Sequence, residues 1–382
     1  MIEKGGKMLG NEKISAGQMG LLMFFAISAS AVTVIPGITG KYAQNDLWLS
    51  PIWASIIGYV TVYIAYRLHQ LYPNQSIIQY SQTILGSFLG KVVSLFFIFF
   101  YLHLTGLIVR GYAEFVVGNF LTRTPISVVM ISMVMVAALA VKGGGEVLGR
   151  TAQFFFFIFL IPVALMPSLL GSMKLQYLFP VLEHGLKPTF LGAASPQAWF
   201  SEVFLMAFFL PFVSNQEKSM RAGMLSVFGT MMLLTIINLF ILLVMGRQAG
   251  DFLYPVMVAF RYISVADFFQ NLDSVVMGIW IIGLYQKISV FYYATVIGTS
   301  QLFGLRDYRP LVLPFGILVV IMGFWSVPDQ LHVSAFDTFA FPFYGPLVQT
   351  VFPLLLLILA YWQKRGQASH AGRTALTDGT ES

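Results

Sequence analysis

The chain contains many apolar segments long enough to cross a membrane, and this feature limits its possible folds more than any other. A membrane-spanning helix needs about 20 predominantly apolar residues. Apolar residues make up 57% of the 382 residues and charged residues only 10%. One soluble core could not bury so many apolar side chains. The sequence therefore predicts an all-α integral membrane protein and excludes a soluble enzyme.

Charged residues, glycines and prolines divide the apolar segments into ten predicted membrane-spanning helices, arranged as two sets of five. The first set covers residues 15–39, 48–67, 92–118, 126–141 and 151–171. The second set covers residues 197–214, 223–246, 275–303, 311–325 and 342–362. Two connections are long enough for short helices of their own: 174–196, and 247–271 with its aromatic amphipathic stretch 252–269.

This division predicts five parts along the chain. They are an N-terminal segment (1–14), a first five-helix repeat (15–171), an outer connection (172–196), a second five-helix repeat (197–363) and a C-terminal tail (364–382). The tail is rich in Gly, Thr, Ser and Ala, so we expect it to be disordered.

Basic residues predict the orientation, because Lys and Arg are retained preferentially in cytoplasmic loops. With the N-terminus inside, 14 of the 22 Lys and Arg residues fall on the inner side and 6 on the outer side. The remaining two, Arg110 and Lys287, lie within spans. We therefore expect both termini in the cytoplasm. The net charge of +6 reflects these inner loops, and we predict no binding to nucleic acid.

The motifs of soluble enzymes are missing from the sequence. The chain has no cysteine, which excludes disulfides, thiolate metal sites and cysteine nucleophiles. It has no nucleophile elbow and no pair of histidines at metal spacing. The glycine run 143–145 lacks the Gly-Lys-Ser/Thr of a phosphate loop and predicts a tight turn between the fourth and fifth spans. We expect no enzymatic activity, no metal site and no cofactor.

The first span of each half combines small or polar residues with a proline. In the first span the run Ser-Ala-Ser-Ala at 28–31 precedes Pro36, and in the sixth span Ser201 and Glu202 precede Pro211. Such paired interruptions predict an inverted-repeat transporter fold with a binding site at the membrane midplane. The ends of broken helices expose N–H and C=O groups that can hold both charged ends of an amino acid. The alternative is that the two prolines only kink their helices.

Ionisable residues inside spans are costly, so each marks a candidate site. Glu202 and Lys287 have no local partner, and we expect them to pair across helices, line water or bind ligand. Arg110 and Glu114 lie four residues apart in the third span, which predicts a structural ion pair. His103, in the same span, is interpreted either as a proton relay or as a residue hydrogen-bonded to a neighbouring helix.

Several segments also carry a resemblance to a known family. They are RGYAE at 110–114, FLTRTPI at 120–126, FPVL at 179–182 with Gly185, EVF at 202–204 before LPF at 210–212, and WSVP at 325–328. In order and spacing they resemble the GerAB-type spore germination permeases, the membrane B subunits of endospore germinant receptors. This family belongs to the amino acid, polyamine and organocation transporter superfamily. The resemblance extends from residue 14 to about 364, with Ala29-Ser30-Ala31 where many relatives carry glycines.

The resemblance implies a LeuT-like fold of five plus five helices with broken first and sixth helices, in the inner membrane of a dormant spore. It implies an A subunit and a lipoprotein C subunit as partners. It also implies that the chain binds a small nutrient, with an amino acid as the favoured type, and passes the signal on to trigger germination. The alternative function is a proton- or sodium-coupled amino-acid transporter. A purely structural scaffold is disfavoured by Glu202 and Lys287.

Position within that fold predicts which residues form the ligand pocket. They come from the first, third, sixth and eighth spans: Ala29, Ser30, Ala31, Thr33, Leu104, Thr105, Ser201, Glu202, Leu205, Gln286 and Lys287. The eighth helix of the superfamily fold runs beside the first, where sodium-coupled relatives hold a cation. The ammonium of Lys287 is therefore a candidate built-in replacement for that cation. The alternative is that Lys287 extends its long side chain to the inner surface.

Overall fold

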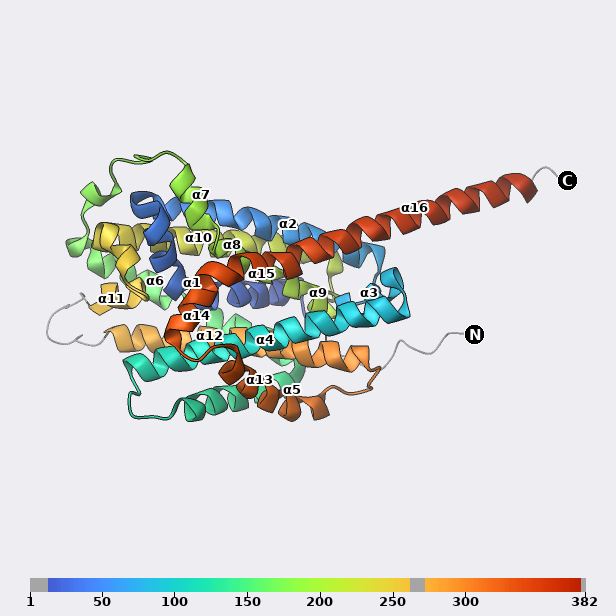
Figure 1. The fold of residues 1–382 in the computed structure, drawn as a ribbon, viewed down its shortest axis with the longest axis horizontal. Helices are drawn as coiled ribbons and strands as arrows, with labels where there is room; N and C mark the ends of the chain where they lie inside the picture. The colour runs from blue at the N-terminus through green and yellow to red at the C-terminus, as the bar shows by residue number, and fades with distance from the viewer. Residues whose placement is uncertain (1–12, 262–271, 379–382) are drawn as a thin grey trace.

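The computed structural model of the chain describes residues 13–261 and 272–378, and these are almost entirely helical (Figure 1). Helices satisfy their own backbone hydrogen bonds, as a membrane requires. The described residues contain seven helical stretches long and apolar enough to cross a membrane. Two of these, Ala16–Leu71 and Ile126–Ser168, each contain two predicted spans, so the seven stretches cover nine of the ten. The missing one is the sixth.

The first half begins with α1, which starts at a capping box formed by Ser15 and Gln18. Two of its helices lie in predicted connections: η1, and α3, which is too short to be a span. The helices of this half are α1 (Ala16–Ala43), η1 (Gln44–Leu49), α2 (Ser50–Leu71), α3 (Ile77–Leu85), α4 (Ser87–Asn119), α5 (Ile126–Phe159), α6 (Ile161–Leu165) and η2 (Met166–Ser172).

The predicted fourth span and the first part of the fifth form the single element α5, which is kinked at Gly144, and the rest of the fifth span forms α6 and η2. The backbone there has φ 85° and ψ −178°, which is not helical. A residue with a β-carbon is strained at this φ, whereas glycine adopts it readily. The glycine run therefore makes the turn predicted for it, with a single residue outside the helical conformation.

The connection and second half contain more short elements than the first. They are η3 (Leu175–Leu178), α7 (Lys187–Ala193), α8 (Pro196–Ser201), η4 (Glu202–Leu205), α9 (Met206–Phe209), η5 (Leu210–Phe212), η6 (Gln216–Lys218), α10 (Ser219–Met245), η7 (Gly246–Asp251), α11 (Pro255–Arg261), α12 (Leu272–Leu302), α13 (Arg309–Ser326), α14 (Gln330–Ala335), η8 (Phe336–Ala340), α15 (Phe341–Pro346), η9 (Leu347–Val351) and α16 (Phe352–Asp378). The elements η8 and η9 are π-helical. Residues 262–269 of the predicted amphipathic stretch lie outside the described residues.

The C-terminal tail differs from the prediction of disorder. Helix α16 continues through it to Asp378 and extends beyond the rest of the helical assembly (Figure 1). No proline interrupts residues 354–378, and alanine recurs in this part of the chain, so helical backbone is compatible with its composition. The residues after 378 lie outside the described part.

The first helix also differs from the prediction, because α1 is continuous where a break was expected. Ser28 donates to the carbonyl of Phe24 and Thr33 to that of Ser30, at 2.7 and 3.0 Å. These hydroxyls find partners within the helix, and alanine, at 29 and 31, favours helix far more than glycine does. Pro36 is accommodated inside the helix.

The sixth span is interrupted as predicted, although by 3-10 turns rather than by extended chain. It consists of α8, η4, α9 and η5, and we call it the interrupted helix (196–212). Its four pieces together cover only the 17 residues 196–212, which is too short for a spanning stretch. It packs against α1 and α2.

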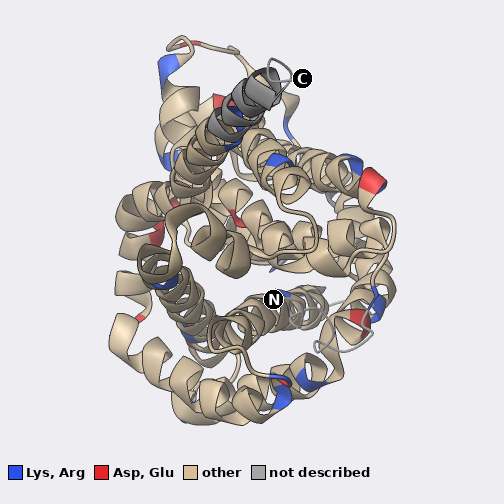
Figure 2. Ribbon diagram, turned by 90° about the vertical axis from the view of Figure 1, so that its right-hand side faces the viewer, with Lys and Arg blue, Asp and Glu red and all other residues tan. Residues whose placement is uncertain are grey.

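Helix α1 lies inside the assembly, against α10, α12 and α5, and is buried around most of its circumference. Helix α4 packs against α12 and α13 on another side. A helix that is apolar all round is expected to be buried in this way. Figure 2 shows few charged residues among the packed helices. Those that do lie there are therefore candidates for a functional role.

Candidate functional site

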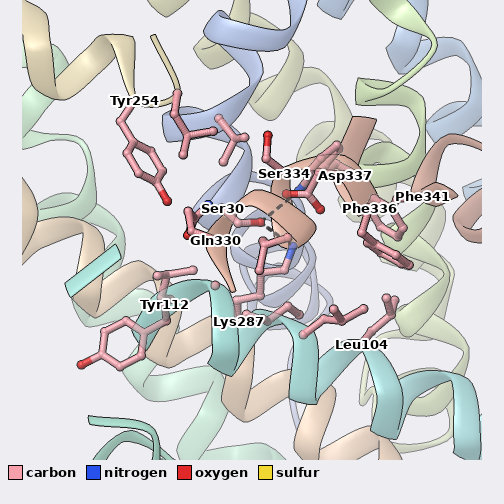
Figure 3. Close-up of a pocket in the computed structure, with 18 of the residues that line it drawn as sticks. Ser30, Leu104, Tyr112, Tyr254, Lys287, Gln330, Ser334, Phe336, Asp337 and Phe341 are labelled. Atoms are coloured by element: carbon pink, nitrogen blue, oxygen red, sulfur yellow. Dashed lines mark hydrogen bonds between the residues drawn. The ribbon is translucent and has the colours of Figure 1, made fainter. Parts of the chain in front are cut away.

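A cavity of about 70 Å³ lies where α1, α4, α12, the interrupted helix and the α14–η8 segment meet (Figure 3). A buried water needs roughly 10–15 Å³ measured in this way, so the cavity has room for about five waters or a compact ligand. Most of its walls are apolar or aromatic. Six polar or charged side chains interrupt them: Ser30, Glu202, Lys287, Gln330, Ser334 and Asp337.

An enclosed ion pair forms one wall of this cavity. The Nζ atom of Lys287, on α12, lies 2.7 Å from Oε2 of Glu202, at the start of η4. The two side chains are only 1% and 2% exposed, so the ammonium does not extend to the inner surface. A pair this deeply buried is stable only when its hydrogen bonds are satisfied.

Ser30 connects this ion pair to α1. Its Oγ accepts a hydrogen bond from Lys287 Nζ at 2.9 Å and another from the Trp199 indole at 3.0 Å. The ammonium therefore sits between α1 and α12, the placement that the built-in cation hypothesis requires. The pair and Ser30 join three elements that are far apart in the sequence, α1, the interrupted helix and α12.

A second polar chain supports the interrupted helix from behind. Ser201 Oγ donates to the carbonyl of Ala198 at 2.7 Å and accepts from Gln349 Nε2 at 3.1 Å. Tyr101 of α4 donates to Gln349 Oε1 at 3.2 Å. These bonds hold the residue before Glu202 in place, so they position the carboxylate without lining the cavity.

Four of the eleven predicted pocket residues line the cavity: Ser30, Leu104, Glu202 and Lys287. The other seven do not. Ala29, Ala31, Thr105, Ser201, Leu205 and Gln286 are buried between helices, and Thr33 lines a separate apolar cavity between α1, α6, α10 and α12. Neighbouring residues of a helix point about 100° apart, so only one residue of the run 29–31 can face the cavity.

Two of these displaced residues have clear packing roles. The carbonyl of Ala29 accepts a hydrogen bond from the Trp280 indole at 2.5 Å, while its methyl group faces Gly283. Gln286 donates to the carbonyl of Leu148 at 3.0 Å and accepts from Thr151 at 3.1 Å. Both residues join α12 to its neighbours.

The sequence prediction missed one face of the α14–η8 segment. Gln330, Ser334 and Asp337 all line the cavity, and their spacing of four and three residues places them on one helical face. The tenth span was predicted to begin only at residue 342. The signal that could have revealed this face is an aspartate within the apolar run Phe336–Ala340.

Asp329 fixes where this segment begins, because its carboxylate caps α14. It accepts hydrogen bonds from the His332 backbone N–H at 3.0 Å and from the His332 ring at 2.8 Å. These bonds from His332 lower the pKa of Asp329, which lies just outside the membrane-spanning stretch. The cap is therefore formed with the carboxylate ionised.

Arg110 and Glu114 form the predicted ion pair on α4, with 2.7 Å between Arg110 Nη2 and Glu114 Oε1. Their side chains are 8% and 18% exposed. Arg110 also donates to the carbonyl of Pro328, and its guanidinium lies 5.2 Å from the centre of the Phe324 ring. The pair does not line the cavity.

His103 packs in an aromatic cluster with Phe99, Phe336 and Tyr344. Its Nδ1 atom is buried and has no hydrogen-bond partner within the described residues. Its neighbour Leu104 faces the cavity, whereas the histidine ring does not line it. The contacts of His103 are therefore those of packing.

Comparison with known proteins places the chain among spore germination proteins. The model of the family described as "Spore germination protein" matches residues 13–330. Spore germination protein KB of Bacillus subtilis (strain 168) is 27% identical over 372 residues, which cover 95% of this chain and 98% of that protein. Spore germination protein YndE of the same organism is 25% identical over 369 residues, with coverages of 93% and 98%.

Solved structures confirm the predicted LeuT-like transporter fold. MhsT in complex with L-phenylalanine matches with a TM-score of 0.68 and 11% identity, covering 91% of this chain and 96% of that chain. Mhp1, a nucleobase-cation-symport-1 family transporter with bromovinylhydantoin bound, matches with a TM-score of 0.64 and 11% identity. The coverages for Mhp1 are 91% and 79%. At this identity the similarity is one of fold.

Proposed function

Since the chain belongs to the spore germination protein family, whose members are not enzymes, we propose that it senses a nutrient in the cavity beside Lys287 and Glu202. Under this proposal it is the B subunit of a germinant receptor that binds a compact germinant, with an amino acid as the favoured type. Binding is then passed to partner subunits and triggers germination.

The observation that carries this proposal is the cavity itself. It combines apolar walls with a few convergent polar groups, as small-molecule sites do. It also adjoins the interrupted helix, and irregular backbone at such depth is tolerated where it is packed in protein or lines a cavity. A ligand there contacts α1, α4, α12 and the α14–η8 segment at once. Movement of these elements around a ligand is the proposed start of the signal.

The proposed partners are an A subunit and a lipoprotein C subunit, and the proposed location is the inner membrane of the spore with both termini in the cytoplasm. Family membership supports the partners, and the excess of Lys and Arg on the inner side supports the orientation. Labelling of single cysteines introduced at Ser15 and at the exposed Lys187, from outside intact cells, tests the orientation. Only the residue at 187 is expected to react.

Coupled amino-acid transport is the second candidate function, favoured by the fold shared with MhsT and Mhp1. Purified protein in proteoliposomes separates the two candidates. A sensor binds radiolabelled amino acid but accumulates none under an imposed proton or sodium gradient. Uptake driven by either gradient would instead establish the transporter.

The position of the site is tested by filling the cavity. Ile108 lines it from α4, whereas Ile131 of α5 lies on the outer face, 45% exposed. Ile108→Trp is expected to weaken binding at least tenfold, because the added ring takes space from the ligand. The matched control Ile131→Trp is expected to bind normally. Equal binding by both variants would place the site elsewhere.

A further inference from the structure

We infer that the ligand of this cavity carries an ammonium group, which binds the carboxylate of Asp337. The inference rests on the proposed function, because it takes the cavity as the binding site. It adds the chemical class of the ligand: a primary amine such as a free amino acid, rather than a neutral sugar, a nucleoside or an organic acid.

The first step is the charge of the cavity walls. Two carboxylates, Glu202 and Asp337, and one ammonium, Lys287, line the cavity. Lys287 forms its ion pair with Glu202, which leaves one negative charge in excess when all three groups are ionised. An ionised carboxylate without a partner in a largely apolar cavity is costly. A cationic ligand group compensates this charge.

The second step is the position of Asp337. Its backbone carbonyl accepts a hydrogen bond from Ser195 at 2.7 Å, which holds the π-helical turn η8 against the start of the interrupted helix. Its carboxylate forms no hydrogen bond or ion pair with any residue that the structure describes, although it is near enough to interact electrostatically with Lys287 and Tyr254. Figure 3 shows Asp337 and Lys287 on the same cavity.

The third step is a second acceptor in need of a donor. Gln330 lines the cavity on the same helical face as Asp337, seven residues before it, and its buried Oε1 lacks a hydrogen-bond partner within the described ranges. Ser334 lies between the two on the same face and adds a hydroxyl oxygen. An ammonium group has three N–H donors and no acceptor. This helical face therefore presents acceptor oxygens for the N–H donors of an ammonium, and the carboxylate of Asp337 is its charged member.

The remaining walls favour an organic cation over a metal ion. Tyr254, Trp280 and Phe336 surround the cavity with aromatic surface, which suits an ammonium and the carbon body attached to it. Hard metal ions require about six oxygen ligands. In the part of the chain that the structure describes, no group of three His, Cys, Asp or Glu side chains could hold a metal.

The test uses purified full-length protein in lipid nanodiscs and a panel of probes: the L-amino acids, ethylamine, L-lactate, D-glucose and inosine. L-Lactate has the shape of L-alanine with a hydroxyl in place of the ammonium. We expect the probes that raise the unfolding temperature to carry an ammonium, and each amino acid that binds to do so at least 100-fold more tightly than its 2-hydroxy analogue.

Asp337→Asn is expected to weaken binding of these amines at least about 30-fold, in the range found when one partner of a buried charge pair is removed. Asp307→Asn, the same change in an exposed loop beyond α12, is the matched control and should bind normally. Gln330→Leu, which removes the unpartnered acceptor and leaves the charges intact, should weaken amine binding about three- to tenfold. This second variant and the hydroxy analogues keep the test valid even if Asp337→Asn unfolds.

Three results would overturn the inference. They are a neutral sugar or nucleoside as the tightest probe, an amine affinity unchanged in Asp337→Asn, and a stabilisation by sodium ions alone that Asp337→Asn abolishes. The Ile108→Trp variant distinguishes failure of this inference from failure of the proposed function. If Ile108→Trp abolishes binding and Asp337→Asn does not, the cavity is the site but its ligand is not held by Asp337. If Ile108→Trp binds normally, the proposed site itself is wrong.

Discussion

Two ion pairs in the membrane-spanning part have the same N–O distance of 2.7 Å. One forms within a single helix and the other between two separate elements. Arg110 and Glu114 are one helical turn apart on α4, so the helix alone brings them together. Lys287 and Glu202 are 85 residues apart, and only the packing of α12 against the interrupted helix brings them together. The first pair therefore depends on secondary structure and the second on the tertiary fold.

The surroundings of the two pairs differ as well. Arg110 has further partners in the carbonyl of Pro328 and the Phe324 ring, and its pair is partly exposed. Within the described residues, Lys287 contacts Ser30 and the Phe291 ring besides Glu202, Asp337 is near enough to act on it electrostatically, and the pair is enclosed. Removal of one charge should therefore cost most at Lys287. A third pair, Arg150 and Glu146 on α5, has side chains 71% and 44% exposed and extends the comparison to the surface.

The largest effect is expected for Lys287→Met. It leaves the Glu202 carboxylate buried without its partner, which typically costs about 3–5 kcal/mol. We expect a strongly reduced amount of folded protein in the membrane and a lower unfolding temperature in detergent. Lys287→Arg should recover part of the stability, since it keeps the charge but places a planar guanidinium where a compact ammonium fits.

The double variant Lys287→Met with Glu202→Gln distinguishes charge from packing. If the unpaired carboxylate is the main cost, the second change removes it, and the double variant should be more stable than Lys287→Met alone. A double variant as unstable as the sum of the two single variants would contradict this interpretation. It would show that the two residues act through separate contacts.

An intermediate effect is expected for Arg110 and Glu114. Each of the single changes Arg110→Glu and Glu114→Arg places like charges one turn apart and breaks a charged hydrogen bond, which is worth about 1.5–3 kcal/mol. The exchanged pair should recover only part of this loss, because a glutamate at 110 cannot donate to the carbonyl of Pro328. The protein level of the four forms in membranes, analysed as a double-mutant cycle, measures the recovery. Full recovery would show that the Pro328 and Phe324 contacts contribute nothing.

The sequence alone predicted the members of both pairs, because an ionisable residue within an apolar span stands out whatever the fold. It also predicted the partner of Arg110, since that partner follows from helical spacing. The partner of Lys287 stayed open among several possibilities. A contact between residues 202 and 287 depends on how two helices pack, and periodicity carries no information on this.

The same limit applies at the cavity. Of Ala29, Ser30 and Ala31, which the sequence predicts as pocket residues, only Ser30 lines the cavity, because a sequence does not give the rotation of α1 about its axis. The row Gln330, Ser334 and Asp337 has a helical spacing that is visible in the sequence. Nothing in that spacing says that the face points inward, and the segment precedes the strongly apolar part of the tenth span.

The break predicted in α1 shows a second limit of the sequence. The prediction rested on the similar composition of α1 and the interrupted helix. Both contain serine and proline, yet only the latter leaves the α-helical conformation. In α1 the hydroxyls of Ser28 and Thr33 bond to carbonyls of the same helix. In the interrupted helix Ser201 also accepts a bond from Gln349 of the tenth span. Irregular backbone there is supported by a neighbouring helix, which composition does not reveal.

The smallest effect is expected at the surface pair, with Glu146→Gln on α5. The change removes a carboxylate 2.5 Å from Arg150, but both side chains are largely exposed, and exposed pairs are typically worth only about 0–1 kcal/mol. Water and salt already screen the two charges, so loss of one leaves nothing buried and unpaired. The unfolding temperature should change little, and the small difference from the unmodified protein should disappear as salt is raised to 1 M. A fall in unfolding temperature as large as that of Lys287→Met would mean that burial does not explain why the ion pairs differ in their contribution to stability. In that case the neighbouring kink at Gly144, two residues before Glu146, would be the structure that Glu146 supports.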